Sequence, residues 1–381
     1  MFREHPGISE VSLCDLEPER LRSQADKWKV ARRFGSFQEV LKSDVDAVAI
    51  FTQRYTHAPL ALDALRAGKH VYCAVPAATS LEELHDLIET VKSSGLTYMM
   101  GETSQYYGAT VFCQEKWKAG AFGDLVYGEG EYYHDMSHGF YDSFKFSGGK
   151  DWKRAASYPP MLYPTHSVAI VLAVSGARMT SVSCLGFADR EADGIFDEKV
   201  SLWGNKFSNQ SALFRTSDGA MARINEFRRV GLIDGRSVRV SLYGTKGCFE
   251  EQANGGIWTT LNPGETDVVE PRICCGHEAT EAQKEMVTTN PALRHDFITD
   301  YAEVHQPLRY RLPASYAKCH TGHEGSHQLL VDDFVTSVIE GTLPPVNVWQ
   351  AARYNAPGIV ANESSRKEGE RLEIPDFGQG L

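Results

Sequence analysis

The chain has 381 residues, of which 42% are hydrophobic and 23% charged, a composition typical of a folded globular protein whose length predicts two domains. Its 39 basic and 50 acidic residues give a net charge of −11, which disfavours a nucleic-acid partner and favours small neutral or mildly polar ligands. The eight cysteines form no CxxC pair, and we expect neither a signal peptide nor a membrane span. The sequence thus predicts a reduced, cytoplasmic protein.

Short β-branched runs alternate with helical patterns from residue 8 to about residue 120. The runs at 45–51 and 70–74 are followed by helical segments, the second of which begins with a capping box of Ser80 and Glu83. This alternation predicts an α/β fold, in which residues 1–123 form a doubly wound parallel sheet flanked by helices.

Longer alternating strands begin at residue 124 and predict a second domain with a large mixed or antiparallel sheet over residues 124–326. Within it, the polar, Gly- and Pro-punctuated segment 250–320 is expected to form loops. Residues 327–381 carry two amphipathic patterns, which predict closing helices that pack back on the first domain.

Asp15 closes the first predicted strand, where a Rossmann-like dinucleotide-binding domain places the carboxylate that binds the adenosine ribose of NAD. The strand and GxGxxG turn expected about 20 residues earlier are absent, and we interpret Met1 as an internal methionine of a longer protein. The alternative is a degenerate domain in which Asp15 caps the next helix. Thr52 and His57 follow another strand and are expected near the cofactor, although His57 could equally begin the following helix without a ligand.

An acid/base cluster is predicted from two Tyr/His pairs and one carboxylate. Tyr163 and His166 lie at a proline-primed helix start, Tyr132 and His134 end a strand, and Glu102 ends another. Burial and neighbouring charges can move the pKa values of these side-chain types toward neutral. Taken one at a time, each is more often an ordinary core residue. Histidine spacing in 134–138 and 320–327 alone is weak evidence for a metal, and we expect none.

With these residues in place, the chain resembles the Gfo/Idh/MocA oxidoreductase family. The resemblance rests on the stretches 67–76, 118–126, 345–352 and 370–376. It implies an N-terminal Rossmann domain that binds NAD, a C-terminal mixed sheet that builds homodimers or homotetramers, and activity on sugars or polyols.

The sequence departs from the family's dehydrogenases at two catalytic positions. Val75, in Ala-Val-Pro76, stands where they carry a lysine, and Leu162 stands where they carry an aspartate. A branch that resembles the chain better is the NAD-dependent glycosidases of the alpha-N-acetylgalactosaminidase type, glycoside hydrolase family 109. The resemblance to this branch rests on Val75-Pro76, Glu102, Tyr132-x-His134 and Tyr163-Pro-Thr-His166. Ala74 differs from the glutamate usual in that branch, which leaves the sugar specificity open.

The resemblance implies hydride removal at C3 of a glycoside, elimination of the C1 substituent, addition of water and reduction at C3. It assigns the C3 hydroxyl proton to His166 or Tyr163, the C2 proton to Tyr132 with His134, and sugar orientation or leaving-group assistance to Glu102. The residues expected at the cofactor are Asp15, Thr52, His57, Val75 and Pro76. Two alternatives remain open: an NAD-dependent sugar dehydrogenase that uses His166 without the lysine, and a non-catalytic sugar-binding protein.

Overall fold

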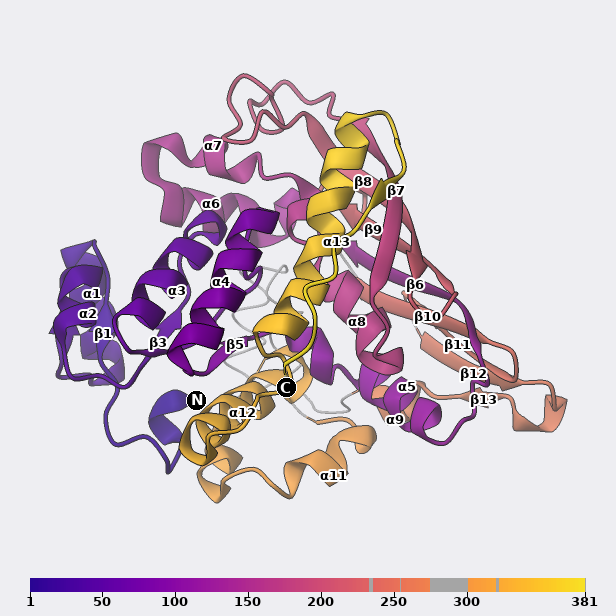
Figure 1. Cartoon of the computed structure of the whole chain (residues 1–381), viewed down its shortest axis with the longest axis horizontal. Helices are drawn as coiled ribbons and strands as arrows, with labels where there is room; N and C mark the ends of the chain where they lie inside the picture. The colour runs from indigo at the N-terminus through magenta and orange to yellow at the C-terminus, as the bar shows by residue number, and fades with distance from the viewer. Residues whose placement is uncertain (233–235, 254, 275–300, 320–321, 381) are drawn as a thin grey trace.

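The computed structural model describes the chain except for residues 233–235, 254, 275–300, 320–321 and 381 (Figure 1). The main helices are α1 (Pro18–Trp28), α2 (Phe37–Lys42), α3 (His57–Arg66), α4 (Leu81–Ser94), α5 (Gly108–Lys118), α6 (Tyr141–Gly148), α7 (Trp152–Ala156), α8 (Thr165–Ser175), α9 (Glu270–Ile273), α11 (Gln306–Arg309), α12 (Ser326–Glu340) and α13 (Val348–Arg366). The strands are β1 (Leu13–Cys14), β2 (Arg33–Phe34), β3 (Ala47–Ile50), β4 (His70–Cys73), β5 (Tyr98–Met100), β6 (Leu125–Tyr133), β7 (Met179–Ala188), β8 (Phe207–Thr216), β9 (Met221–Phe227), β10 (Val238–Gly244), β11 (Gly247–Gln252), β12 (Gly255–Thr260), β13 (Asp267–Val268) and β14 (Leu372–Glu373). Parallel strands with helices precede a large mixed sheet, so the predicted fold class is confirmed.

The parallel strands of the first domain form two separate groups. Strands β3, β4 and β5 pair in that order, whereas β1 and β2 pair only with each other. Ser80 caps α4 by accepting a hydrogen bond from the backbone N–H of Glu83 at 3.1 Å, which confirms this half of the predicted capping box. The Glu83 carboxylate accepts from the backbone N–H and the hydroxyl of Thr79 rather than from the N–H of Ser80. Phe51, directly after β3, is 65% exposed. Among the described residues, no strand joins β3 to β1, and β3 has a partner on one side only.

The large sheet has nine described strands in the order β13-β12-β11-β10-β6-β9-β8-β7-β14. Strands β6 and β9 are parallel neighbours at its centre, and the other pairs are antiparallel. Segment 250–320 was expected to form loops. This expectation is wrong for 250–252, 255–260 and 267–268, which lie in strands, and for 270–273 and 306–309, which are helical. Phe249 and Trp258 explain the difference, because both bury their rings near Phe112 of α5 although glycines interrupt the alternating pattern around them. Residues 275–300 of that segment lie outside the described part of the chain.

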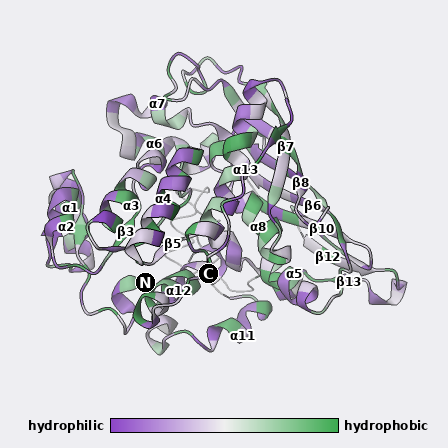
Figure 2. Cartoon of the chain, in the orientation of Figure 1, coloured by the Kyte–Doolittle hydropathy of each residue, from purple (hydrophilic) through white to green (hydrophobic). Residues whose placement is uncertain are grey.

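Helix α8 lies on the inner face of the large sheet and is apolar along most of its length (Figure 2). It is enclosed because α5 packs on it from one side and β6 and β10 from the other. Gly130 of β6 makes this packing possible: a Cβ atom there would lie 1.9 Å from the carbonyl oxygen of Ser167. The absence of that side chain lets the first turn of α8 rest directly on the strand. None of the described helices is both long and apolar enough to cross a membrane.

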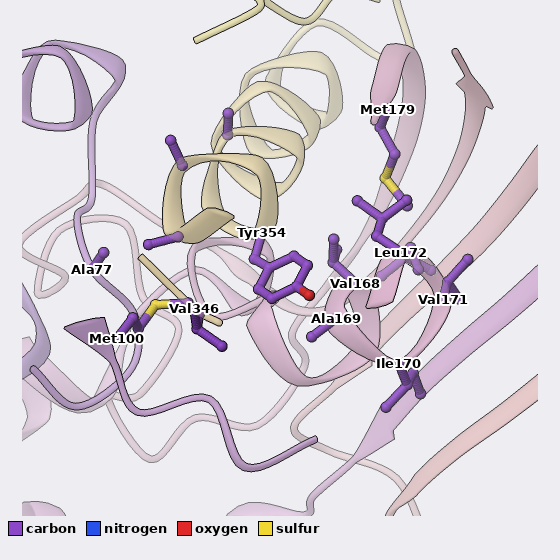
Figure 3. Packing of buried hydrophobic residues seen from close by; sticks show 14 of the residues in the cluster. Ala77, Met100, Val168, Ala169, Ile170, Val171, Leu172, Met179, Val346 and Tyr354 are labelled. Carbon is purple, nitrogen blue, oxygen red and sulfur yellow. The ribbon is translucent and has the colours of Figure 1, made fainter. Parts of the chain in front are cut away.

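Helix α13 joins the two sheets. It contacts α4 and β5 on the side of the parallel strands and α8 and β7 on the side of the large sheet. Tyr354 of α13 lies between the helix and α8, near Val346 and Val168, and Met100 at the end of β5 lies close by (Figure 3). The phenol of Tyr354 donates a hydrogen bond to the side-chain oxygen of Gln105 at 3.0 Å. This continuous core holds the end of β5 close to the start of α8, where the predicted acid/base residues lie.

Candidate active site

Glu102 and His166 form a buried pair that joins the end of β5 to the start of α8. Glu102 follows β5, and His166 lies in the first turn of α8. The carboxylate oxygen Oε1 of Glu102 lies 2.6 Å from Nδ1 of His166 and also accepts the backbone N–H of Ser104 at 2.8 Å. The two residues are 0% and 6% exposed, respectively. With Nδ1 engaged by the carboxylate, Nε2 is the ring nitrogen left for a substrate.

The aromatic residues predicted for the cluster surround this pair. The ring centre of Tyr132, at the end of β6, lies 5.2 Å from that of His166, 6.0 Å from that of Tyr163 and 5.4 Å from that of His134. The rings of Tyr163 and His166 are 5.3 Å apart. All five residues predicted from the sequence as an acid/base cluster are therefore adjacent in space, at or next to the ends of β5 and β6 and the start of α8. Their chemical roles are proposals.

Electrostatics favour the charged forms of the buried pair. Burial alone would lower the pKa of His166, but the Glu102 carboxylate and Tyr163 raise it to about 9. Burial would raise the pKa of Glu102, and the charge and hydrogen bonds of His166 more than offset this, so its pKa lies below the ordinary value. For Tyr132, burial raises the pKa of the phenol well above its usual range, although Arg228 acts in the opposite direction.

A second buried ion pair, Glu226–Arg228, lies beside the cluster and was not predicted from the sequence. Glu226 of β9 is the parallel neighbour of Tyr132, and its carboxylate accepts hydrogen bonds from Arg228 at 2.6 Å and from the hydroxyl of Ser167. Burial raises the pKa of Glu226 to about 7. The guanidinium of Arg228 lies 4.6 Å from the ring centre of Tyr132. The alternating acid and base in an otherwise strand-like segment, Asn-Glu-Phe-Arg228, was the available signal in the sequence.

The residues predicted to bind a cofactor lie at the carboxyl ends of the parallel strands. Asp15 follows β1, Thr52 follows β3, and Val75 and Pro76 follow β4. His57 is the first residue of α3 and is buried, with Nδ1 2.8 Å from the carbonyl oxygen of Pro76 and Nε2 3.1 Å from that of Thr52. Both of its nitrogens thus face backbone carbonyls, and the residue ties two strand-end turns together. Burial lowers the pKa of His57.

The exposure of the side chains at the carboxyl ends of the parallel strands shows whether a dinucleotide can reach them. Asp15 accepts the backbone N–H of Glu17 at 2.8 Å and keeps its side chain 28% exposed, so it can accept a ribose hydroxyl. Thr52 is exposed and Val75 partly exposed, which leaves room beside the β3 and β4 ends. Asp15 is thus accessible to a ribose, and the edge beside Thr52 and Val75 is accessible to the nicotinamide end of NAD.

The histidine segments considered for a metal contain no suitable group in the described part of the chain, where no three His, Cys, Asp or Glu side chains are arranged to hold an ion. The rings of His134 and His138 stack at 4.6 Å between centres. Nε2 of His327 lies 3.1 Å from Nδ1 of His323. His320 lies outside the described residues.

Residues 1–102 match the model of a family described as oxidoreductases with an NAD-binding Rossmann fold. The chain is 26% identical over 403 residues to a protein from Streptomyces filamentosus named glycosyl hydrolase family 109 protein, covering all of this chain and 74% of that relative. The predicted resemblance to Gfo/Idh/MocA oxidoreductases and to glycoside hydrolase family 109 is thus confirmed.

Solved structures share the fold at low sequence identity. One is an oxidoreductase from Agrobacterium radiobacter in complex with NAD⁺, L-tartaric acid and magnesium, with a TM-score of 0.71, 14% identity and coverage of 98% of this chain and 93% of that one. Another is a levoglucosan dehydrogenase in complex with NADH and levoglucosan, with a TM-score of 0.69, 16% identity and coverage of 96% and 90%. These similarities extend the match from residues 1–102 to the arrangement of nearly the whole chain.

Proposed function

From its relationship to NAD-binding Rossmann oxidoreductases and to glycosyl hydrolase family 109 proteins, we propose that this chain is an NAD-dependent, sugar-active enzyme that cleaves glycosides by oxidation, elimination, addition and reduction. The observation that carries the proposal is the buried Glu102–His166 pair, against which Tyr132 and Tyr163 pack. These groups can move protons at carbon and oxygen, whereas the positions of the dehydrogenase lysine and aspartate hold Val75 and Leu162, which cannot.

In this proposal, Asp15, Thr52, Val75 and Pro76 hold NAD, with His57 fixing the two turns from which Thr52 and Pro76 extend. When bound by these residues, NAD would supply reversible hydride transfer at C3 of the sugar. This redox route requires no pair of carboxylates at a fixed separation.

The proposed proton transfers follow from the contacts. His166 takes the proton of the C3 hydroxyl through Nε2 in the form of the enzyme in which its ring is neutral, or Tyr163 takes it. Glu102 is fully buried and bonded to His166, which supports a role in positioning that ring rather than direct contact with sugar. Tyr132 with His134 removes the C2 proton, which the C3 ketone makes acidic. Burial keeps the Tyr132 phenol protonated near neutral pH, so Tyr132 must give up its hydroxyl proton before it can take the proton from C2. His134 is proposed to receive that hydroxyl proton.

An NAD-dependent dehydrogenase is the second candidate, favoured by the structural similarity to a levoglucosan dehydrogenase and by the retained His166. The two candidates differ in whether the overall reaction consumes NAD. Glycoside cleavage supports the proposal if a panel of nitrophenyl glycosides is turned over many times per NAD without NADH accumulating. Stoichiometric NADH release would establish the dehydrogenase instead. If the purified protein neither carries nor binds nicotinamide, as mass spectrometry and titration would reveal, both enzymatic proposals fail and a sugar-binding role remains.

The substitution Tyr132→Phe tests whether Tyr132 acts at C2 while other residues act at C3. It should abolish cleavage while deuterium exchange at C3, which reports reversible oxidation, continues. Tyr133→Phe is the matched control, because Tyr133 lies on the opposite face of β6, where its ring stacks on Phe227 at 4.9 Å. If Tyr132→Phe abolishes both reactions in a folded protein, Tyr132 does not act at C2 alone.

A further inference from the structure

Arg54 is a partly buried cation beside the candidate active site. Its guanidinium carbon Cζ lies 4.3 Å from the ring centre of Tyr163, 5.1 Å from that of Phe144, 5.3 Å from that of Phe140 and 5.7 Å from that of Tyr158. Its side chain makes no hydrogen bond or ion pair with any residue in the described part of the chain. Cation–π attraction accounts for its place among the rings, but it leaves the N–H donors in the plane of the guanidinium unused.

The neighbouring Arg228 provides the contrast. Its guanidinium donates to Glu226 at 2.6 Å, to the carbonyl oxygen of Phe227 at 3.1 Å and to that of Tyr132 at 3.3 Å. Arg228 is therefore committed to protein acceptors, whereas Arg54 is not. A partly buried charged group normally has such an acceptor, so a ligand is the simplest partner for Arg54.

Arg54 is held in place before any ligand binds. It begins the short 3₁₀ turn η2 (Arg54–Thr56) after β3, in which the hydroxyl of Thr56 donates to the carbonyl oxygen of Gln53 at 2.7 Å. His57 packs against the turn from the other end, with one ring nitrogen 3.1 Å from the carbonyl oxygen of Thr52 and the other 2.8 Å from that of Pro76; the single N–H of the neutral ring donates to one of the two. A preorganised guanidinium loses little conformational freedom when it binds an anion.

Tyr163 links Arg54 to the acid/base cluster. Its ring centre is 4.3 Å from the Arg54 guanidinium and 5.3 Å from the ring centre of His166. A group bound at Arg54 and a carbon reacting at His166 can thus belong to one sugar unit. Guanidinium donors match the paired oxygens of a carboxylate or phosphate.

We propose that Arg54 binds an anionic group of the substrate, so that the sugar acted on at His166 is acidic, bearing a carboxylate or a phosphate. The inference rests on the proposed function for its sugar. It differs from the expectation of a neutral ligand that the net charge of −11 suggested, because Arg54 adds a positive charge beside the ion pairs Glu102–His166 and Glu226–Arg228.

Calorimetric binding in the presence of NAD tests the proposal without requiring turnover. The probes are D-glucuronate, D-galacturonate and D-glucose 6-phosphate, each compared with its neutral hexose. We expect at least one acidic sugar to bind more tightly than its neutral counterpart, and Arg54→Gln to weaken that binding by about 10- to 100-fold without changing neutral-sugar binding. Tight binding of the uronates identifies a carboxylate site, and tight binding of the phosphate ester identifies a phosphate site.

Two further variants keep the result interpretable. Arg54→Lys retains the charge but loses the planar fork, and should give an intermediate loss. Arg66→Gln removes the same charge from the exposed end of α3 and should change nothing. Three results would each overturn the inference. They are equal binding of acidic and neutral sugars, a preference for acidic sugars that survives Arg54→Gln in a folded protein, and no binding of any acidic sugar. Binding through Arg54 without glycoside cleavage would instead overturn the proposed function alone.

Discussion

Substitution of Glu102 by Gln should release the proton that His166 holds. The carboxylate lies 2.6 Å from Nδ1 of His166 and is the main reason that the pKa of this histidine rises from 6.5 to about 9 despite burial. A shift of that size corresponds to roughly 3 kcal/mol in favour of the imidazolium. Without the charge, burial dominates and we expect the pKa to fall to 6.5 or below.

The assay is a pH titration of the histidine ring protons by NMR. The chain has 13 histidines, and the resonance missing from a His166→Asn variant identifies the relevant one. Glu115→Gln is the matched control, because it removes the same charge from an exposed position on α5. A His166 midpoint that stays near 9 in Glu102→Gln would refute the electrostatic reasoning for the pair.

Three other predictions follow from the same geometry. Gly130→Ala should destabilise the fold by about 1–3 kcal/mol, because its Cβ would meet the Ser167 carbonyl. Gly35→Ala, whose Cβ has no neighbour closer than 3.9 Å, should leave the stability unchanged, and thermal unfolding measures both variants. If His166 acts as a base, kcat/KM should rise with pH toward an apparent pKa near 9, and a profile flat from pH 7 to 10 would exclude that role. Leu213 is 60% exposed on the outer face of the large sheet and should lie in a contact between subunits. Leu213→Asp should therefore lower the molecular mass measured by analytical ultracentrifugation. A monomer mass for both the unsubstituted protein and the variant would contradict the expected homo-oligomer.

Local patterns were sufficient to predict much of the fold. The Ser80–Glu83 cap lies within one helical turn, where residue type alone determines the contact. The site residues Glu102, Tyr132 and His166 were also found from their positions at element ends, because the ends of β5, β6 and α8 meet at one edge.

Contacts that depend on register between distant strands could not be predicted in this way. Glu226 lies beside Tyr132 only because β9 pairs in parallel with β6, some ninety residues earlier in the chain. Arg54 shows the same limit: the four rings around it come from residues 140–163, and nothing near it in the sequence indicates that it has no acceptor. Likewise, β11 and β12 are short and interrupted by glycine, so their burial against α5 outweighs a weak local pattern.

The Glu102–His166 pair has a consequence for the contact between the parallel strands and the large sheet. Glu102 follows β5 and His166 lies in α8 against the large sheet, so separating these elements would expose both charges to water. Since the pKa of His166 is raised, the attraction is fully present below pH 6.5 and is lost as the pH rises through about 9; for Glu102, whose pKa is lowered, it weakens again in acid as the carboxylate takes up a proton. The contact between Glu102 and His166 is therefore strongest between those two limits of pH.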